Sequence, residues 1–395
     1  MDFRFTPEEE AFRKEVREFL ERETPKDWPA FEGRAGLGEL WPFLRQFSRK
    51  LGEKGWLTMA WPEEYGGQDR SVMEQLIFTE ETCYYRVPVA GSMAVTIVGP
   101  VIMLYGSEEQ KRGYLPRIAK GEVDFCLCYS EPGAGSDLAA LQCRAVEDGD
   151  DFVISGQKTF TSLAHLNEYG WLAARTDPDV PKHKGISLFI VDMKTPGITV
   201  RPLIDMLGQH IFNDVFFDEV RIHKSCLIGE KNRGWYHLAT ALDFERTPQF
   251  VFFPPAAIRP ILEDLVQFAK EVKRNGQPLA KDPMVRRKLA EMFIEFEVGR
   301  TLAYRVACML GKGLIPNCEA SMVKLYSTEL HQRVANIGME ILGLYGQLEA
   351  GSKWAQLRGS IEYAYLNSVS ATIGAGTSEV QRSIIAIRGL GLPRG

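Results

Sequence analysis

The chain has 395 residues, of which 45% are hydrophobic and 25% are charged, as in ordinary globular proteins. This length predicts two or three packed units. The net charge of −5 offers no broad basic field for nucleic acid, and no apolar run is long enough to span a membrane. The N-terminal sequence MDFRFTPEEE has no apolar signal region, so a cytoplasmic location is expected.

The first predicted element is a helix that begins near Thr6. Thr6, Pro7 and Glu9 match the N-cap, the first-turn proline and the third-position glutamate of a capped helix start. An apolar stripe then follows at helical spacing, through Phe12, Val16, Phe19 and Leu20. Further helical patterns cover Ser71–Tyr85 and Met93–Tyr105.

The composition changes after Gly121. Short segments rich in Val, Ile, Phe and Thr, separated by glycine and aspartate turns, continue to about Gly229. They predict antiparallel strands of a small barrel or sandwich. Examples are Val123–Tyr129, Asp151–Ser155, Gly185–Asp192, Gly197–Leu203 and Val215–Ile222.

Long amphipathic patterns return from Trp235 onward. The order of helices, a β segment and a helical bundle is typical of an α+β fold and not of a doubly wound sheet. We expect an N-terminal helical domain over residues 1–121, a central β domain over 122–234 and a C-terminal helical bundle over 235–395. The predicted C-terminal helices are Tyr236–Phe250, Ile258–Lys273, Pro283–Leu310, Glu319–Gly343 and Thr377–Arg388.

The seven cysteines and six histidines follow no zinc-binding pattern. Cys126 and Cys128 would point to the same face of a strand, where we expect two small core residues. No H-x-x-x-H pair occurs, and no metal site is predicted.

The segment Tyr129–Asp137 reads YSEPGAGSD and follows a predicted strand. Gly133 and Gly135 would let the backbone approach a ligand closely. The hydroxyls of Ser130 and Ser136, with nearby backbone N–H groups, could serve phosphate or flavin polar atoms. Position 138 is leucine, so the third glycine of a dinucleotide fingerprint is missing. Taken alone, a Gly-Ala-Gly turn is more often structural than phosphate-binding.

Several ordered motifs together closely resemble the acyl-CoA dehydrogenase flavoproteins. They are Gly99-Pro100, Tyr105-Gly106, Gln110-Lys111, Leu115-Pro116, YSEPGAGSD, SGQK and TFTS over 155–162, and GAGTSEVQR over 374–382. The resemblance runs essentially from end to end. It implies an N-terminal helical domain, a central antiparallel β-barrel or sandwich domain and a C-terminal four-helix bundle, with FAD as cofactor and an acyl-CoA as substrate.

The resemblance also implies cofactor contacts from the β domain. Leu127, Cys128 and Ser130 occupy the strand that lies along the flavin, and Gly135 belongs to the adjoining cofactor-binding loop. Ser136 matches a serine that contacts both the FAD pyrophosphate and the substrate.

Four more cofactor residues follow from the same resemblance. Phe160 matches an aromatic residue beside the isoalloxazine ring, and Ser162 matches a hydroxyl near flavin N5. Thr377 and Glu379 match contacts to the diphosphate and ribose end. Without the resemblance, Phe160 would be interpreted as a core aromatic residue.

The implied reaction needs a base, because the α-hydrogen of a thioester is weakly acidic. Many family members place a glutamate directly before the C-terminal Gly-Thr, where this chain has Ala375. Isovaleryl-CoA and long-chain relatives place it on an earlier helix, in a Leu-Asp-x-Glu-Arg context. Residues 242–246 read LDFER, which predicts Glu245 as the base and Arg246 as an orienting or charge-balancing residue. The alternative is a solvated Glu–Arg pair on a helix.

In the implied mechanism, Glu245 removes the α-proton while the flavin accepts hydride from the β carbon. The thioester oxygen then gains negative charge. The family stabilises it with a backbone N–H at Ala375 or Gly376 and a ribityl hydroxyl, and such donors contribute about 3 kcal/mol each. The implied electron acceptor is an electron-transfer flavoprotein. The acyl chain of the substrate cannot be read from the sequence.

Two departures concern the surface that serves a neighbouring subunit's cofactor. The Lys-Glu-Arg-x-x-Phe-Gly context of many homotetramers reads KEVKRNG over 270–276, so the arginine and the phenylalanine are replaced. The later Gln-x-x-Gly-Gly segment begins with Glu340, and a carboxylate opposes a diphosphate. Either a related subunit completes an α2β2 heterotetramer, or Lys273 or Arg274 replaces the arginine in a homotetramer.

Other functions are possible on the same scaffold. Flavin monooxygenases of this group generally lack the helix glutamate, and nitroalkane oxidases have aspartate at the position of Ala375, so Glu245 favours dehydrogenation. Glu245 also argues against a non-catalytic subunit. The basic run over 281–288 is interpreted as a solvated helix face, and nucleic-acid binding has no support.

Overall fold

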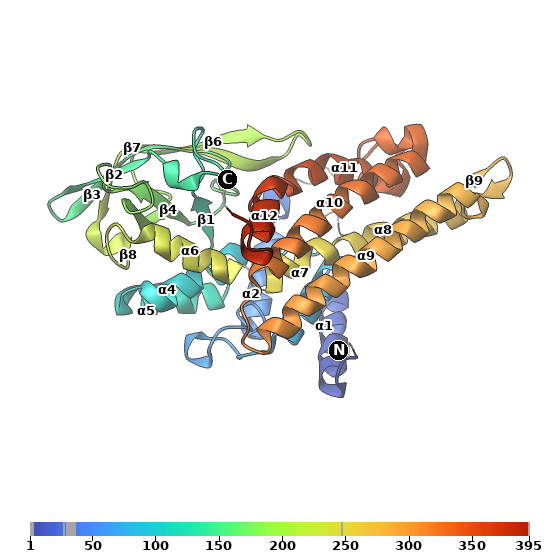
Figure 1. Ribbon diagram of the computed structural model, residues 1–395, viewed down its shortest axis with the longest axis horizontal. Helices are drawn as coiled ribbons and strands as arrows, with labels where there is room; N and C mark the ends of the chain where they lie inside the picture. Colours follow the sequence, from blue (N-terminus) through green and yellow to red (C-terminus); the bar gives the residue numbers. More distant parts are fainter. Residues whose placement is uncertain (1–3, 27, 29–36, 246–247, 394–395) are drawn as a thin grey trace. The chain divides into compact units, whose positions relative to one another are not determined.

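The computed structural model describes residues 4–26, 28, 37–245 and 248–393, without the side chains of 37, 240–245 and 248–250. The chain divides into two compact units. The helical unit comprises Met1–Ala35, Ser71–Pro88 and Pro248–Gly395, and the mixed unit comprises Gly36–Arg70 and Val89–Thr247. Each unit is assembled from segments far apart in the sequence, as the colours of Figure 1 show.

The N-terminal part of the helical unit contributes α1 (Pro7–Glu23) and α3 (Val72–Tyr84), which pack against each other. The predicted start of α1 is confirmed. The Thr6 hydroxyl accepts from the N–H of Glu9, and the Glu9 carboxylate accepts from the N–H of Thr6. The predicted stripe is buried, because it is the face that α1 turns to its neighbours.

The C-terminal part of the helical unit is a set of long packed helices. α10 packs on α9 and α11, and α8 packs on α9; Figure 1 shows α8, α9 and α10 running alongside one another. The core between them contains Leu265, Leu289 and Val334. The elements are α7 (Pro248–Ala256), α8 (Ile258–Glu271), β9 (Lys273–Arg274), β10 (Gln277–Pro278), α9 (Pro283–Leu310), α10 (Asn317–Leu342), α11 (Ser360–Ala371) and α12 (Ser378–Ile384).

The mixed unit contains a mostly antiparallel sheet in the order β6-β7-β3-β2-β4-β5-β8, with β1 paired to β4. The pairs β1–β4 and β2–β4 are parallel, which the antiparallel prediction did not anticipate. The strands are β1 (Phe125–Cys128), β2 (Arg144–Asp148), β3 (Asp151–Lys158), β4 (Tyr169–Arg175), β5 (Ile186–Asp192), β6 (Ile198–Ile204), β7 (His210–His223) and β8 (Leu227–Ile228).

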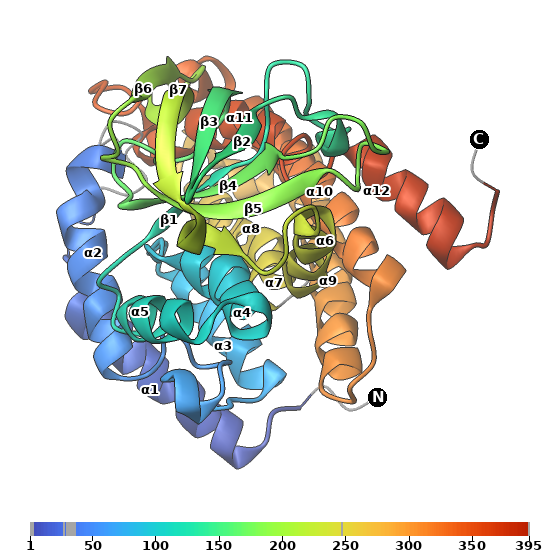
Figure 2. The same cartoon turned by 90° about the vertical axis from the view of Figure 1, so that its left-hand side faces the viewer.

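Helices of the mixed unit lie beside this sheet. α6 packs on β5 and on α4, and Figures 1 and 2 both place α4, α5 and α6 on the same side of the strands. The helices are α2 (Leu37–Glu53), α4 (Gly99–Tyr105), α5 (Glu108–Ala119) and α6 (Gly234–Glu245), with a π-helical turn over Ala94–Val98.

The α+β prediction is therefore confirmed. The segment expected as one helix over Tyr236–Phe250 corresponds to α6 and α7, and residues 246 and 247 lie outside the described residues. Among the helices described, none is both long and apolar enough to cross a membrane.

Candidate active site

Successive side chains of strand β1 point to opposite faces, as expected for a pleated strand. Cys126 and Cys128 point into the core of the sheet with their sulfur atoms 3.9 Å apart, and both are buried. Leu127 is partly exposed on the other face. Since the Cys128 side chain is fully buried, only its backbone remains for the flavin contact that the sequence suggested.

The YSEPGAGSD loop is anchored by a buried ion pair. The Lys158 ammonium, which is 0% exposed, donates to Glu131 Oε1 at 2.7 Å and to the Tyr129 carbonyl at 3.0 Å. The Glu131 carboxylate also accepts from the backbone N–H groups of Gln142 and Cys143, at 2.6 and 2.9 Å. These four hydrogen bonds fix the loop against β3.

Beyond this anchor, the loop opens to solvent. Ser130 is partly exposed, and Gly135 and Ser136 are exposed. A Cβ added at Gly133 or Gly135 would meet no atom within 4 Å. No contact within the protein therefore requires glycine there, and the space is open to a ligand.

The turn after β3 carries Phe160 and Ser162, and it lies against the YSEPGAGSD loop through a hydrogen bond from the Thr159 N–H to the Ser130 carbonyl, 2.9 Å. Phe160 has a left-handed backbone, φ 52°, and its side chain is 64% exposed. Ser162 is also exposed. A non-glycine residue in this conformation costs about 1 kcal/mol or more, so its surroundings must hold it.

Asn213 on β7 forms hydrogen bonds that stabilise this turn. Its side chain is completely buried, and its Nδ2 donates to the Thr161 carbonyl at 3.0 Å. Its own carbonyl accepts from the Thr161 N–H at 2.9 Å. Its Oδ1 lies 2.7 Å from His210 Nε2. Because Nδ2 is committed to a carbonyl, Oδ1 must accept, and His210 must carry its proton on Nε2.

A second histidine, His165, packs against His210. The ring of His165 stacks on that of His210 with centroids 3.7 Å apart. Burial, and then the neighbouring His210 ring, lower the pKa of His165. The backbone between Phe160 and Ser162 is therefore supported by a stacked pair of imidazoles through Asn213.

In the helical unit, residues 374–377 of the GAGTSEVQR segment form a tight loop, and residues 378–382 belong to α12. Ala375 and Gly376 both have left-handed backbones, φ 53° and 88°. Lys324 of α10 donates to the carbonyls of Gly376 and Ala371 at 2.8 and 3.1 Å. Gln381 Nε2 donates to the carbonyls of Ala375 and Gly376 at 3.2 and 3.3 Å.

Thr377 is the N-cap of α12, since its hydroxyl accepts from the N–H of Val380 at 3.2 Å. Glu379 is exposed, and hydrogen bonds from its own backbone N–H and the Thr377 hydroxyl lower its pKa. The loop therefore keeps Glu379 ionised beside Thr377.

The two predicted catalytic residues fall at the edge of the described chain. Glu245 is the last residue of α6, and its side chain is outside the part that the structure describes. Arg246 lies outside the described residues altogether. Their roles stay predictions.

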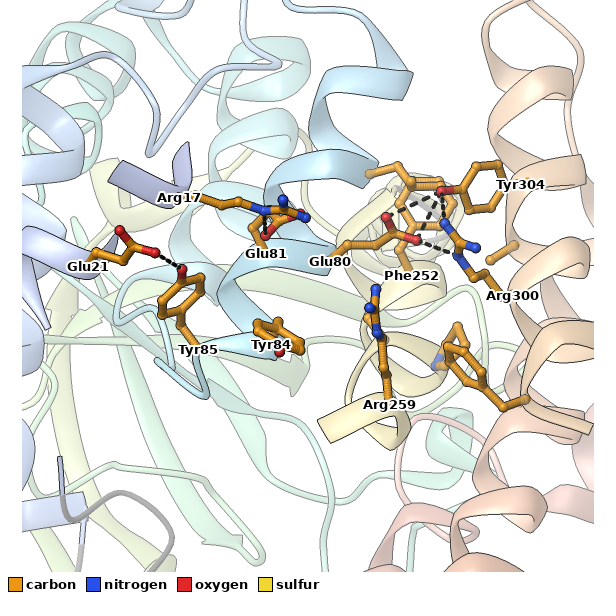
Figure 3. A pocket seen from close by; sticks show the side chains of 15 residues that line it. Arg17, Glu21, Glu80, Glu81, Tyr84, Tyr85, Phe252, Arg259, Arg300 and Tyr304 are labelled. Carbon is orange, nitrogen blue, oxygen red and sulfur yellow. Dashed lines mark hydrogen bonds and ion pairs between the residues drawn. The ribbon is translucent and has the colours of Figure 1, made fainter. Parts of the chain in front are cut away.

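A cavity of about 320 Å³ in the helical unit contains none of the predicted residues. Figure 3 shows Glu80, Arg300 and Tyr304 pointing toward one another. Arg300 Nε and the Tyr304 hydroxyl each donate to Glu80 Oε1 at 3.0 Å, and Arg17 Nε donates to Glu81 at 2.8 Å. Because these charges are neutralised within the protein, we interpret the cavity as structural.

The surface that the sequence linked to a neighbouring subunit carries a short hairpin, β9–β10. Asn275 and Gly276 form its turn with φ 52° and 77°, the two positive values of a tight hairpin turn. Glu340 forms an ion pair with Lys288. α9 also exposes apolar side chains, with Ile294 66% and Val298 44% accessible.

Sequence reasoning had not assigned roles to Asn213, Lys324 or Gln381, nor to the Glu131–Lys158 pair. Glu131, Lys158 and Gln381 belong to the motifs quoted above, so their position in those motifs could have indicated a role. Asn213 and Lys324 lie far from their partners in the sequence, and no local sequence pattern indicates their contacts.

Three family models match the chain: the acyl-CoA dehydrogenase N-terminal domain over residues 6–122, the middle domain over 126–220 and the C-terminal domain over 232–390. Acyl-CoA dehydrogenase FadE26 of Mycobacterium tuberculosis is 38% identical over 405 residues, covering 100% of this chain and 99% of the relative.

Solved structures agree with the sequence relatives. A chain of the "Tcur3481-Tcur3483 steroid ACAD" is 38% identical with a TM-score of 0.91, and all of both chains is covered. A chain of the ChsE4-ChsE5 complex from Mycobacterium tuberculosis is 37% identical with a TM-score of 0.89, again covering all of both. This chain is therefore a member of the acyl-CoA dehydrogenase family of FAD-dependent oxidoreductases.

Proposed function

We propose that this chain binds FAD and dehydrogenates the α,β bond of a bulky, steroid-type acyl-CoA to the trans-2-enoyl-CoA. The observation that carries the proposal is the end-to-end match, at 38% identity, to a chain of a complex named a steroid ACAD. An electron-transfer flavoprotein is the proposed acceptor, on the family resemblance.

The residues of the mixed unit fit a flavin cofactor. Phe160 presents an exposed ring on a rigid turn, and the exposed hydroxyls of Ser136 and Ser162 are suitable partners for cofactor oxygen and nitrogen atoms. Between Phe160 and Ser162, the Thr161 hydroxyl is buried without a partner among the described residues. The Phe160 ring and the hydroxyls of Ser136, Thr161 and Ser162 would suit a flat ring system with hydrogen-bond donors and acceptors along its edge.

In the proposed reaction, Glu245 takes the α-proton of the thioester, which adds roughly 10²–10⁴-fold to the rate. Arg246 orients or balances that carboxylate. The N–H groups of the Ala375–Gly376 loop face the thioester oxygen and stabilise its developing charge. Bound FAD supplies the two-electron acceptor. Ser136 contributes to holding both the substrate and the cofactor.

We further propose that a related subunit completes the assembly. Val272 and Asn275 stand where homotetrameric members have the arginine and the phenylalanine, and Glu340 replaces the glutamine that the family resemblance places near a diphosphate. The apolar side chains exposed on α9 suit burial against another chain. The similar chain from Mycobacterium tuberculosis belongs to the ChsE4-ChsE5 complex, which has two named partners, in keeping with this proposal.

The test is an anaerobic titration of the flavin-loaded protein, alone and co-purified with a related subunit, with CoA thioesters of steroid side chains, branched acids and straight-chain acids. Steroid-type thioesters should bleach the oxidised flavin at stoichiometric amounts. Bleaching by straight-chain thioesters alone would contradict the substrate class. Bound flavin that no thioester reduces would contradict the dehydrogenase function.

A further inference from the structure

We propose that Lys324 is a positioning residue, which holds the Ala375–Thr377 loop with its N–H groups facing the substrate thioester. This inference rests on the proposed function, since it concerns the same site. No sequence motif quoted above includes Lys324, and its role emerges only from the contacts of α10 with the loop.

The contacts fix the direction of two peptide groups. The Ala375 carbonyl accepts from Gln381, and the Gly376 carbonyl accepts from Gln381 and Lys324. In a trans peptide the N–H points opposite to the C=O. The N–H groups of Gly376 and Thr377 therefore point away from Lys324 and Gln381.

These donors are available for a ligand. No backbone acceptor is found among the described residues for the N–H groups of Ala375, Gly376 or Thr377, whereas the N–H groups of Gly374 and Ser378 on either side bond to Ser370 and Thr372. The loop thus offers consecutive donors with its carbonyl dipoles turned away, the arrangement that stabilises negative charge.

The loop conformation needs an anchor. Ala375 is a non-glycine residue with φ 53°, which is unfavourable without support. Lys324 reaches the loop from α10 and ties the Gly376 carbonyl to the Ala371 carbonyl at the end of α11. A charged donor makes a stronger hydrogen bond than a neutral one, so Lys324 is the stronger of the two anchors.

The charge of Lys324 is also uncompensated by direct contact. Within the described residues it forms no ion pair, although it is half-buried. Burial lowers its pKa, while the carboxylates of Glu329 and Glu379 act in the opposite direction from further away. A cation behind the peptide groups polarises them toward the thioester oxygen, which strengthens the donors where negative charge develops.

The experiment compares Lys324→Met, Lys324→Arg and Lys324→Gln with a control, Lys312→Met, whose lysine is exposed after α9. Flavin-loaded protein, co-purified with a related subunit where loading requires it, is bleached anaerobically by excess acyl-CoA. The carbonyl stretch of a bound 3-thia acyl-CoA, which has no β-hydrogen to lose, is recorded by Raman difference spectroscopy. Melting temperatures and flavin content are measured on the same samples.

We expect Lys324→Met to slow the maximal bleaching rate about 10- to 100-fold, with a small change in the half-saturating acyl-CoA concentration. The carbonyl stretch should rise toward its frequency in water, because the donors are misaligned. Lys324→Arg should recover most of the rate and of the stretch, and Lys312→Met should match the wild type.

Bleaching at the wild-type rate and an unchanged carbonyl stretch in Lys324→Met would overturn the inference. If that variant does not fold, wild-type behaviour of Lys324→Gln would overturn it equally, whereas a graded loss from arginine to glutamine supports it. A wild-type protein that holds flavin but is bleached by no acyl-CoA contradicts the proposed function and this inference with it.

Discussion

At the scale of single residues, the candidate site depends on a few buried polar groups that support exposed ones. Phe160 and Ser162 can face a ligand because Asn213 holds the backbone between them. Lys158 does the same for the loop that carries Ser136, through its ion pair with Glu131. Buried hydrogen-bond networks of this kind favour one conformation, and each member is costly to remove.

Replacing Asn213 with Asp keeps the size of the side chain but places a carboxylate oxygen against the Thr161 carbonyl. We expect a loss of about 1–3 kcal/mol in the free energy of unfolding and an FAD affinity weakened about tenfold or more. Urea unfolding of the apoprotein and flavin fluorescence titration measure the two. Asn336→Asp, on an exposed position of α10, is the control. Unchanged FAD affinity in Asn213→Asp would contradict a supporting role.

His331 gives a prediction for pH. Burial lowers its pKa from 6.5 to about 4, and its Nε2 is buried without a partner among the described residues. Between these values the folded protein binds fewer protons than the unfolded chain. The stability that His331 contributes is therefore fully present above pH 6.5 and is lost as the pH falls through 4.

His331→Gln should remove this dependence. Relative to the variant, the wild type should lose up to about 3 kcal/mol of unfolding free energy between pH 6.5 and 4. Denaturant unfolding of both proteins across this range makes the comparison. Curves that stay parallel would show that the histidine is not held neutral by the fold.

The site was predictable where its residues stand in local motifs. Ser136, Phe160, Ser162 and Thr377 follow from the sequence in this way, although their contacts with FAD stay predictions. Cys128 shows the limit, since strand alternation predicts a core side chain and family resemblance predicts a cofactor contact. Because the Cys128 side chain is completely buried, both predictions can hold only if its backbone makes the contact with FAD. Asn213 and Lys324 were beyond reach, because their partners are distant in the sequence.

At the scale of elements, a buried network joins α1, α3 and α9. Arg13 is 7% and Glu81 2% exposed, with Arg13 Nη1 2.6 Å from Glu81 Oε1. Glu80, on the preceding position of α3, accepts from Arg13, Arg300 and Tyr304. Burial, and then the charge of Glu80, raise the pKa of the Tyr304 phenol. These contacts specify how the three helices meet.

Removing the Glu81 charge leaves buried Arg13 with Glu80 as its remaining carboxylate partner among the described residues. Glu81→Gln should therefore destabilise the protein by about 1–3 kcal/mol. Glu18→Gln is the matched control, because Glu18 forms an exposed pair with Lys14 at 3.8 Å and should cost less than about 0.5 kcal/mol. Thermal and urea unfolding of both variants provide the values. Equal effects of the two changes would contradict the assignment of the stability to buried charge.

Elements were predictable wherever local chemistry agreed with periodicity. The capping box and apolar stripe located α1, and α9 was expected with the same bounds that it has, Pro283–Leu310. The parallel pairing of β1 with β4 was not predictable, because strand patterns carry little information on which strands become neighbours. Pairing depends on long-range packing.

At the scale of the whole molecule, we predict that the chain works with a related subunit. Expressed alone, it should bind less than one FAD per chain, and co-expression with the related subunit should raise its flavin content. Ile294→Lys, on the exposed apolar face of α9, should weaken assembly while leaving the melting temperature of the isolated chain within a few degrees. Flavin absorbance and size-exclusion chromatography with light scattering measure both. One FAD per chain in a homotetramer formed alone would contradict the heteromeric assembly.

The role of Glu245 as the base can be tested by single-turnover flavin reduction in wild type and Glu245→Gln. Both proteins, flavin-loaded and assembled, are mixed anaerobically with the acyl-CoA that bleaches the wild type best. Glu230→Gln serves as control, because Glu230 is exposed shortly before α6. We expect Glu245→Gln to retain FAD and to bind the acyl-CoA, but its flavin should be reduced about 10²–10⁴-fold more slowly. Reduction of Glu245→Gln at the wild-type rate would contradict this role.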